Sequence, residues 1–102
     1  MRHSVDVHFR TDDPTAAGHF PGNPIIPGAL LLDEVLRAIA GANAAPPSLI
    51  RSAKFLRPVR PGDALVVGWD TTGTGQTRFE CRTRDAGELV LVGTAEHEVT
   101  PR

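Results

Sequence analysis

The alternation of apolar and polar side chains predicts five β-strands in this chain. Near the N-terminus, Val5, Val7 and Phe9 alternate with polar residues, which is typical of a strand with one buried face. The segment 76–84 alternates in the same way. The remaining strand-like segments are 49–56, 64–69 and 88–99.

The segment 29–40 has a different pattern, which predicts a helix. Apolar residues cover nearly every side of its helical wheel. The residues that interrupt them are Asp33, Glu34 and Arg37. A helix that is apolar on all sides is typical of a buried helix. Pro27 just before the segment and Gly41 just after it are the residues expected at its two ends.

One strand, one helix and four strands follow one another, and this order predicts an α+β fold. Turns at 57–63, 72–75 and 85–87 connect the last four strands, so we expect antiparallel pairing. One helix and one sheet form two layers, with the inner face of the sheet wrapped around the helix. No linker or repeat divides the chain, so we expect residues 1–102 to form a single domain.

Length and composition narrow the classes of protein that fit. A domain of 102 residues buries only about 60–65% of its unfolded surface, which favours oligomerisation. The net charge of −1 argues against a general nucleic-acid-binding protein. The sequence has no apolar run of about 18 residues and no charged-then-apolar leader, so we expect no membrane span and a cytoplasmic protein. Cys81 is the single cysteine, which excludes an intrachain disulfide and a multi-cysteine metal cluster.

The segment 18–34 contains three parts that proton transfer on a carbonyl compound requires. His19 lies in a proline-rich loop, and an imidazole accepts a proton near neutral pH. Asp33 lies in the apolar helix, where desolvation favours the protonated form and makes it a candidate acid. Gly28 lies at the helix start, where N–H groups without internal partners favour negative charge on a bound carbonyl oxygen.

Each of these residues also has a purely structural interpretation. His19 would hydrogen-bond to the loop backbone, and Gly28 would be no more than a glycine at a helix start. Asp33 would pair with Arg37 four residues later, which stabilises the ionised carboxylate and opposes the role of an acid. The residues alone leave these alternatives open.

The same segment resembles the 3-hydroxyacyl-[acyl-carrier-protein] dehydratases of fatty acid synthesis. Their pattern is G-H-F-P-G-x-P-x-x-P-G, with Glu or Asp fourteen positions after the histidine. The matching positions in this chain are Gly18, His19, Phe20, Pro21, Gly22, Pro24, Pro27, Gly28 and Asp33. In having aspartate at the last position, the chain resembles the branch of the family that makes or isomerises 2-decenoyl thioesters. The segment Lys54–Asp63 is similar to the family's turn after the helix.

This resemblance implies a hot-dog fold, in which a curved antiparallel sheet wraps one long buried helix, usually in a dimer. It also implies dehydration of 3-hydroxyacyl thioesters, on acyl carrier protein or coenzyme A, to trans-2-enoyl thioesters without a metal or other cofactor. His19 is then the base and Asp33 the acid, and His19 of one subunit faces Asp33 of the other. The implied substrate-binding residues are Phe20, Pro21, Gly22, Gly28, Ala29 and Arg37.

Two departures from the family pattern keep other functions open. Arg37 stands where family members usually have glutamine, and only one strand precedes the histidine loop. We therefore retain an acyl thioesterase of the same fold and a non-catalytic acyl-binding subunit as alternatives. Lys54, Arg57 and Arg60 either steer an acidic carrier protein or form a solvated positive rim.

Overall fold

The computed structural model describes residues 2–9, 25–43, 49–72 and 75–96 of the chain. The bounds of its elements are Arg2–His8 for β1, Gly28–Asn43 for α2, Leu49–Phe55 for β2, Ala64–Thr71 for β3, Gln76–Thr83 for β4 and Leu89–Glu96 for β5. The helix and the five strands that the pattern predicts are therefore present. Among the residues that the structure describes, no helix has the length and hydrophobicity that crossing a membrane requires.

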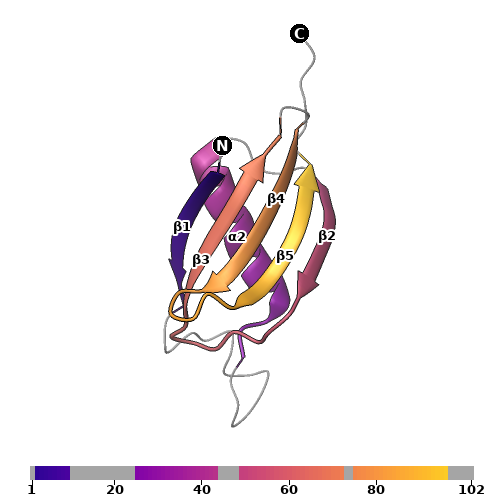
Figure 1. Cartoon of the computed structure of the whole chain (residues 1–102). Coiled ribbons are helices and arrows are strands. Elements are labelled where there is room, and N and C mark those ends of the chain that lie inside the picture. The colour runs from indigo at the N-terminus through magenta and orange to yellow at the C-terminus, as the bar shows by residue number, and fades with distance from the viewer. Residues whose placement is uncertain (1, 10–24, 44–48, 73–74, 97–102) are drawn as a thin grey trace.

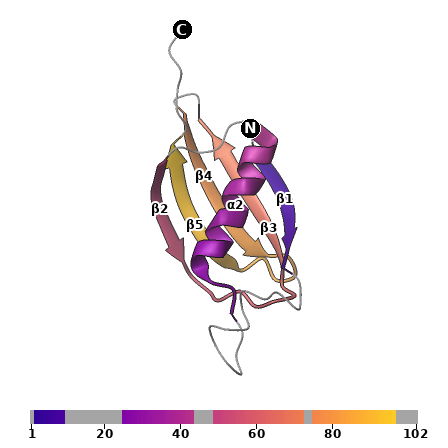
Figure 2. The same ribbon diagram turned by 180° about the vertical axis from the view of Figure 1, so that it is seen from behind.

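The five strands form one antiparallel sheet in the order β1-β3-β4-β5-β2. Figure 1 shows this sheet curving in front of α2, and Figure 2, from behind, shows α2 lying across its concave face. The chain passes from α2 to β2 at one edge of the sheet and then crosses to β3 beside β1. This confirms the predicted α+β architecture, with one curved sheet around one helix.

The core lies between α2 and the concave face of the sheet. Leu31, Val35 and Ile39 form the buried stripe of the helix, and each is at most 2% exposed. They belong to one cluster with buried side chains of the sheet, which include Leu65, Val67, Trp69, Phe79, Cys81 and Leu91. Burial raises the pKa of the Cys81 thiol to about 11, so this cysteine is a packing residue.

Only one side of α2 is buried in the single chain. Ala29, Asp33, Arg37 and Gly41 form the opposite stripe, which is exposed. We call these four residues the open stripe. The all-round apolar pattern predicts fuller burial than this, and the difference arises because one sheet covers only one side of a helix.

The helix continues past Gly41 to Asn43, so the prediction that Gly41 ends it is wrong. Apart from its chain neighbours and the nearby backbone of the helix, no described residue has an atom within 4 Å of the position that a Cβ on Gly41 would take. A glycine in this open position weakens the helix by about 1 kcal/mol relative to alanine, but it does not interrupt the helical hydrogen bonds.

Two glycines allow β4 and β5 to pair closely. Gly87 has a φ of 68° in the turn between the strands, a left-handed conformation that most side chains disfavour. Gly93 lies opposite Phe79 in the register. A Cβ on Gly93 would collide with the Phe79 ring and with the carbonyl oxygen of Ser52. The ring of Phe79 therefore lies directly over the backbone of β5.

We predict opposite effects of alanine at two glycines. Gly93→Ala lowers the free energy of unfolding by about 1–3 kcal/mol, because Phe79 must move to admit the methyl group. In the single chain, Gly41→Ala raises it by about 0.5–1 kcal/mol, because the position is open there and alanine favours the helix. Urea unfolding of both variants beside the parent measures these changes. An unaltered stability in Gly93→Ala would contradict the packing of Phe79 over β5.

Candidate functional site

The predicted base, His19, lies outside the residues that the structure describes, as do Phe20, Pro21 and Gly22. Their roles in the site stay predictions. The described part of the chain does include the helix start, the predicted acid and its possible ion-pair partner. These residues are Gly28, Ala29, Asp33 and Arg37.

Hydrogen bonds on both sides of Pro27 set the position of the helix start. The N–H groups of Leu30 and Leu31 donate to the Pro27 carbonyl oxygen at 3.0 and 3.1 Å, which closes the first turn. The N–H of Ile26 donates to the Val59 carbonyl oxygen at 2.7 Å. Ile26 and Val59 are both buried, so this bond ties the segment before α2 to the loop between β2 and β3.

The first N–H groups of α2 belong to Gly28 and Ala29. An α-helix provides no internal acceptor for the N–H groups of its first turn. The helix dipole favours negative charge at this end, and no acidic side chain occupies the first turn. This end of α2 is therefore suited to a bound carbonyl oxygen that gains negative charge.

A pocket of about 300 Å³ opens beside the helix start. Its walls are mostly apolar and come from α2, from the end of β2 and from the loop that follows. They include Gly28, Leu31, Phe55, Leu56, Arg57 and Val59. The Phe55 ring lies 3.2 Å from the position that a Cβ on Gly28 would take, so the glycine lets this ring approach the first turn.

Phe55 and Leu56 are pocket residues that reasoning from the sequence missed. Their exposed fractions are 47% and 41%, which is high for large apolar side chains. A signal was present, since both belong to the segment Lys54–Asp63 that resembles the dehydratases. Exposed apolar side chains beside a pocket mark a surface for a ligand or for a second chain.

The candidate acid does not line this pocket in the single chain. Asp33 lies about 140° around the helix from Gly28, and its side chain is 50% exposed. Its Oδ2 lies 3.1 Å from Nε of Arg37, and Arg37 also approaches Glu34 at 3.8 Å. The ion pair that is the structural alternative for Asp33 is therefore present. The described part of the chain leaves the Asp33 side chain half exposed, which is less desolvation than an acid requires.

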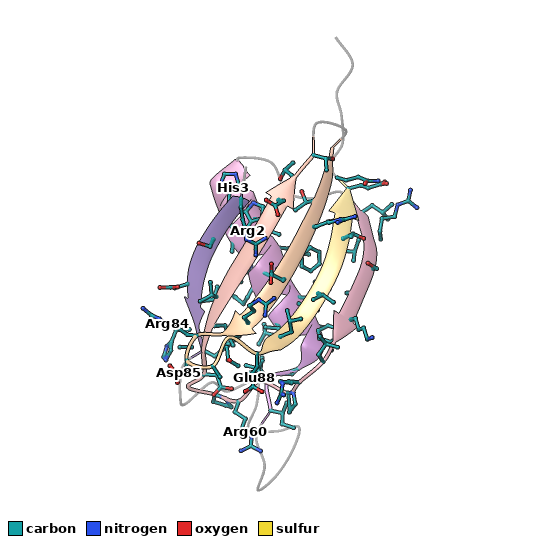
Figure 3. All side chains as sticks on the ribbon, viewed as in Figure 1. Arg2, His3, Arg60, Arg84, Asp85 and Glu88 are labelled. Atoms are coloured by element: carbon teal, nitrogen blue, oxygen red, sulfur yellow. The ribbon has the colours of Figure 1, made fainter. Side chains whose placement is uncertain are left out.

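The three cations considered for carrier-protein steering do not line one common pocket. Arg57 lines the pocket and pairs with Glu88 at 2.6 Å. Lys54 lines a different hollow, on the outer face of the sheet. Arg60 lies with Glu88 at the end of the sheet nearest the start of α2 (Figure 3). Of the three, Arg57 borders the candidate site.

One protein family matches nearly the whole chain. The ApeI-like family, described as ApeI dehydratase, matches residues 1–93. The 3-hydroxyacyl-[acyl-carrier-protein] dehydratase FabZ of Klebsiella pneumoniae is 34% identical over 96 residues, which cover 81% of this chain and 64% of that relative. FabZ of Thermus thermophilus is 36% identical over 66 residues, which cover 55% of this chain and 46% of the relative. The chain thus spans about half to two-thirds of the length of these relatives.

Solved structures share the arrangement of sheet and helix. The dehydratase heterocomplex ApeI:P from Xenorhabdus doucetiae has a TM-score of 0.78 at 20% identity, covering 94% of this chain and 86% of its own. The (R)-hydratase from A. caviae involved in PHA biosynthesis has a TM-score of 0.70 at 16% identity, covering 98% and 95%. These likenesses confirm the hot-dog fold, and the match over residues 1–93 shows that the chain belongs to the ApeI-like dehydratase family.

Proposed function

We propose that this protein removes water from 3-hydroxyacyl thioesters to give trans-2-enoyl thioesters. One observation carries the proposal: Gly28, at the start of α2, borders an apolar pocket. The chain in which this occurs belongs to the ApeI-like family. The curated relatives are named 3-hydroxyacyl-[acyl-carrier-protein] dehydratases, which supports the same reaction here.

In the proposed reaction, His19 takes the proton from C2 of the substrate. The electron pair moves toward the thioester carbonyl, and the N–H groups at the start of α2 stabilise the charge on its oxygen. The C2–C3 double bond then forms as the C3–O bond breaks, and Asp33 donates the proton with which hydroxide leaves as water. His19 afterwards gives up its proton and Asp33 regains one through solvent.

This site needs a second chain, because Asp33 belongs to the open stripe and not to the pocket. β2 is an edge strand of the sheet, and it carries exposed apolar side chains at Leu49 and Phe55. A second copy that covers this edge and the open stripe would bury these groups and desolvate Asp33. These observations support our proposal that the working site forms in a homodimer, with His19 of one subunit facing Asp33 of the other.

A different chain of the same fold is the second candidate for the partner. The Xenorhabdus doucetiae dehydratase is a heterocomplex, which supports this arrangement. The mass of the purified chain in solution separates the two candidates. A homodimer has twice the mass of the 10.9 kDa chain. A chain that pairs only with a different protein has the mass of a monomer when purified alone.

The acyl group is proposed to arrive on an acyl carrier protein or on coenzyme A. The names of the curated relatives specify the carrier protein.

The reaction as written uses proton transfer alone, so it calls for no metal and no redox cofactor. A single cysteine, buried at Cys81, fits a reducing compartment and supports placing the protein in the cytoplasm.

Incubation of the protein with a 3-hydroxydecanoyl thioester tests the proposal, with 2-enoyl formation followed by absorbance. His19→Ala and Asp33→Asn should each reduce turnover by about 10²–10⁴-fold, the usual contribution of a general base or acid. Release of free thiol without 2-enoyl product would identify a thioesterase. Binding without turnover by the parent chain would favour a non-catalytic acyl-binding subunit.

Mixing the two inactive variants tests whether the site is shared between subunits. When His19→Ala and Asp33→Asn are refolded together, about half of the dimers contain one subunit of each kind, and one of their two sites keeps both native residues. Activity should therefore return to about a quarter of the parent value. Activity that stays absent in the mixture would place both residues within one chain.

Arg37→Gln tests the ion pair at the open stripe. The variant frees Asp33 from an exposed pair of about 0.3–0.5 kcal/mol, so turnover should rise about twofold. Arg84→Gln is the matched control, because Arg84 pairs with Asp6 on the sheet and its loss should leave turnover unchanged. A fall in turnover in Arg37→Gln would show instead that Arg37 binds the substrate.

A further inference from the structure

The face of the sheet opposite α2 contains a hollow of about 540 Å³, which we call the outer groove. Figure 3 views this face with its side chains. The residues of the groove that matter here are Ser52, Lys54, Arg78, Leu89, Val92 and Thr94. Lys54 and Phe55 are consecutive in β2 and point to opposite faces, so the outer groove and the pocket at Gly28 lie on different sides of the sheet.

The outer groove has hydroxyl groups at one end and an apolar floor along β5, and the paired side chains of Glu80 and Arg82 border that floor. The hydroxyl groups of Ser52 and Thr94 share a hydrogen bond of 2.9 Å at the polar end. Val92 follows on the same side of β5, and Leu89 lies further toward the start of the strand. From Thr94 to Leu89 the strand extends about 17 Å at about 3.4 Å per residue, which is long enough to support an alkyl chain.

The strand register places one cation on each side of this floor. Lys54 of β2 lies opposite Val92, and Arg78 of β4 lies opposite Thr94. Long side chains at opposite and diagonal positions of a sheet reach one another. The ammonium of Lys54 and the guanidinium of Arg78 can therefore both contact a group that lies above Thr94.

Among the described residues, neither of these two cations has a carboxylate partner. Arg82, which also lines the groove, and the nearby Arg2 are both paired. Arg2 contacts both Asp70 and Glu80, and Arg82 pairs with Glu80 at 2.6 Å. Partial burial raises the pKa of Glu80, but the hydrogen bonds from the two arginines outweigh it and hold that pKa below its ordinary value. Glu80 is thus ionised and is already paired with Arg2 and Arg82. The outer groove is positive on a chain whose net charge is −1.

We propose that the outer groove binds a free long-chain carboxylate. The carboxylate lies above Thr94 between Lys54 and Arg78, and the alkyl chain covers Val92 toward Leu89. A carboxylate suits this place because a guanidinium donates two parallel N–H bonds to it, while the ammonium supplies a point charge. Binding also removes the apolar floor from water. This site is separate from the proposed reaction and does not depend on it.

Titration of the full chain with dodecanoate below its micelle concentration tests the proposal, with the backbone amides followed by NMR. The amides of Val92 and Thr94 should shift. The double variant Lys54→Met, Arg78→Met should weaken affinity by about tenfold or more, because hydrogen bonds to charged groups contribute at least that much. The matched control is Arg51→Met, Arg84→Met. It removes an exposed arginine of β2 and an exposed arginine of the turn after β4, both outside the groove, and should leave affinity unchanged.

Other results would overturn the proposal. Shifts confined to Gly28 and Leu31 would mean that dodecanoate binds only in the pocket at the helix start. Equal affinity for dodecan-1-ol would show that the cations play no part. Binding only to phosphatidylglycerol vesicles would assign the outer face to a membrane. Self-association that the substitutions at Lys54 and Arg78 abolish would assign it to a second copy of the chain.

Discussion

The rotation of one helix about its axis determines where each described group of the candidate site lies. Burial of Leu31, Val35 and Ile39 against the sheet fixes that rotation. At 3.6 residues per turn, Asp33 lies midway between two buried residues in sequence and therefore points to the opposite side. The fold thus holds the amide end of α2 beside an apolar pocket and keeps the candidate acid outside it. For this reason we propose a site that extends beyond a single chain.

The loop between β2 and β3 holds the helix start in place and also forms part of the pocket. Its Val59 carbonyl oxygen accepts the hydrogen bond from Ile26, one residue before Pro27. In the same loop, the N–H of Gly62 donates to the carbonyl oxygen of Phe9 at 2.8 Å, which ties the end of β1 to this region. The segment Lys54–Asp63, which resembles the dehydratases, therefore has a structural role in the candidate site. It positions the helix start and forms part of the pocket wall.

Local patterns in the sequence predicted the helix and the strands. They did not predict the contacts between these elements. The alternation in 76–84 predicted a strand with one buried face, and Phe79 and Cys81, two residues apart in this strand, are both buried. The apolar residues around Asp33 indicated a desolvated acid, yet the carboxylate is half exposed. Sequence pattern alone does not distinguish a helix side that packs on its own sheet from one that packs on another chain. The outer groove depends on the register between Lys54 and Val92, which no local pattern reveals.

The most decisive measurement is a crystal structure of the purified protein with a bound 3-hydroxyacyl thioester analogue. It gives the distances between His19 and Asp33 within each subunit and across each interface. The shared-site model predicts that the short distance is the one across the interface, with the thioester carbonyl oxygen at the N–H groups of Gly28 and Ala29. An Asp33 that stays in solvent beside Arg37 in every subunit, far from every His19, would contradict the model.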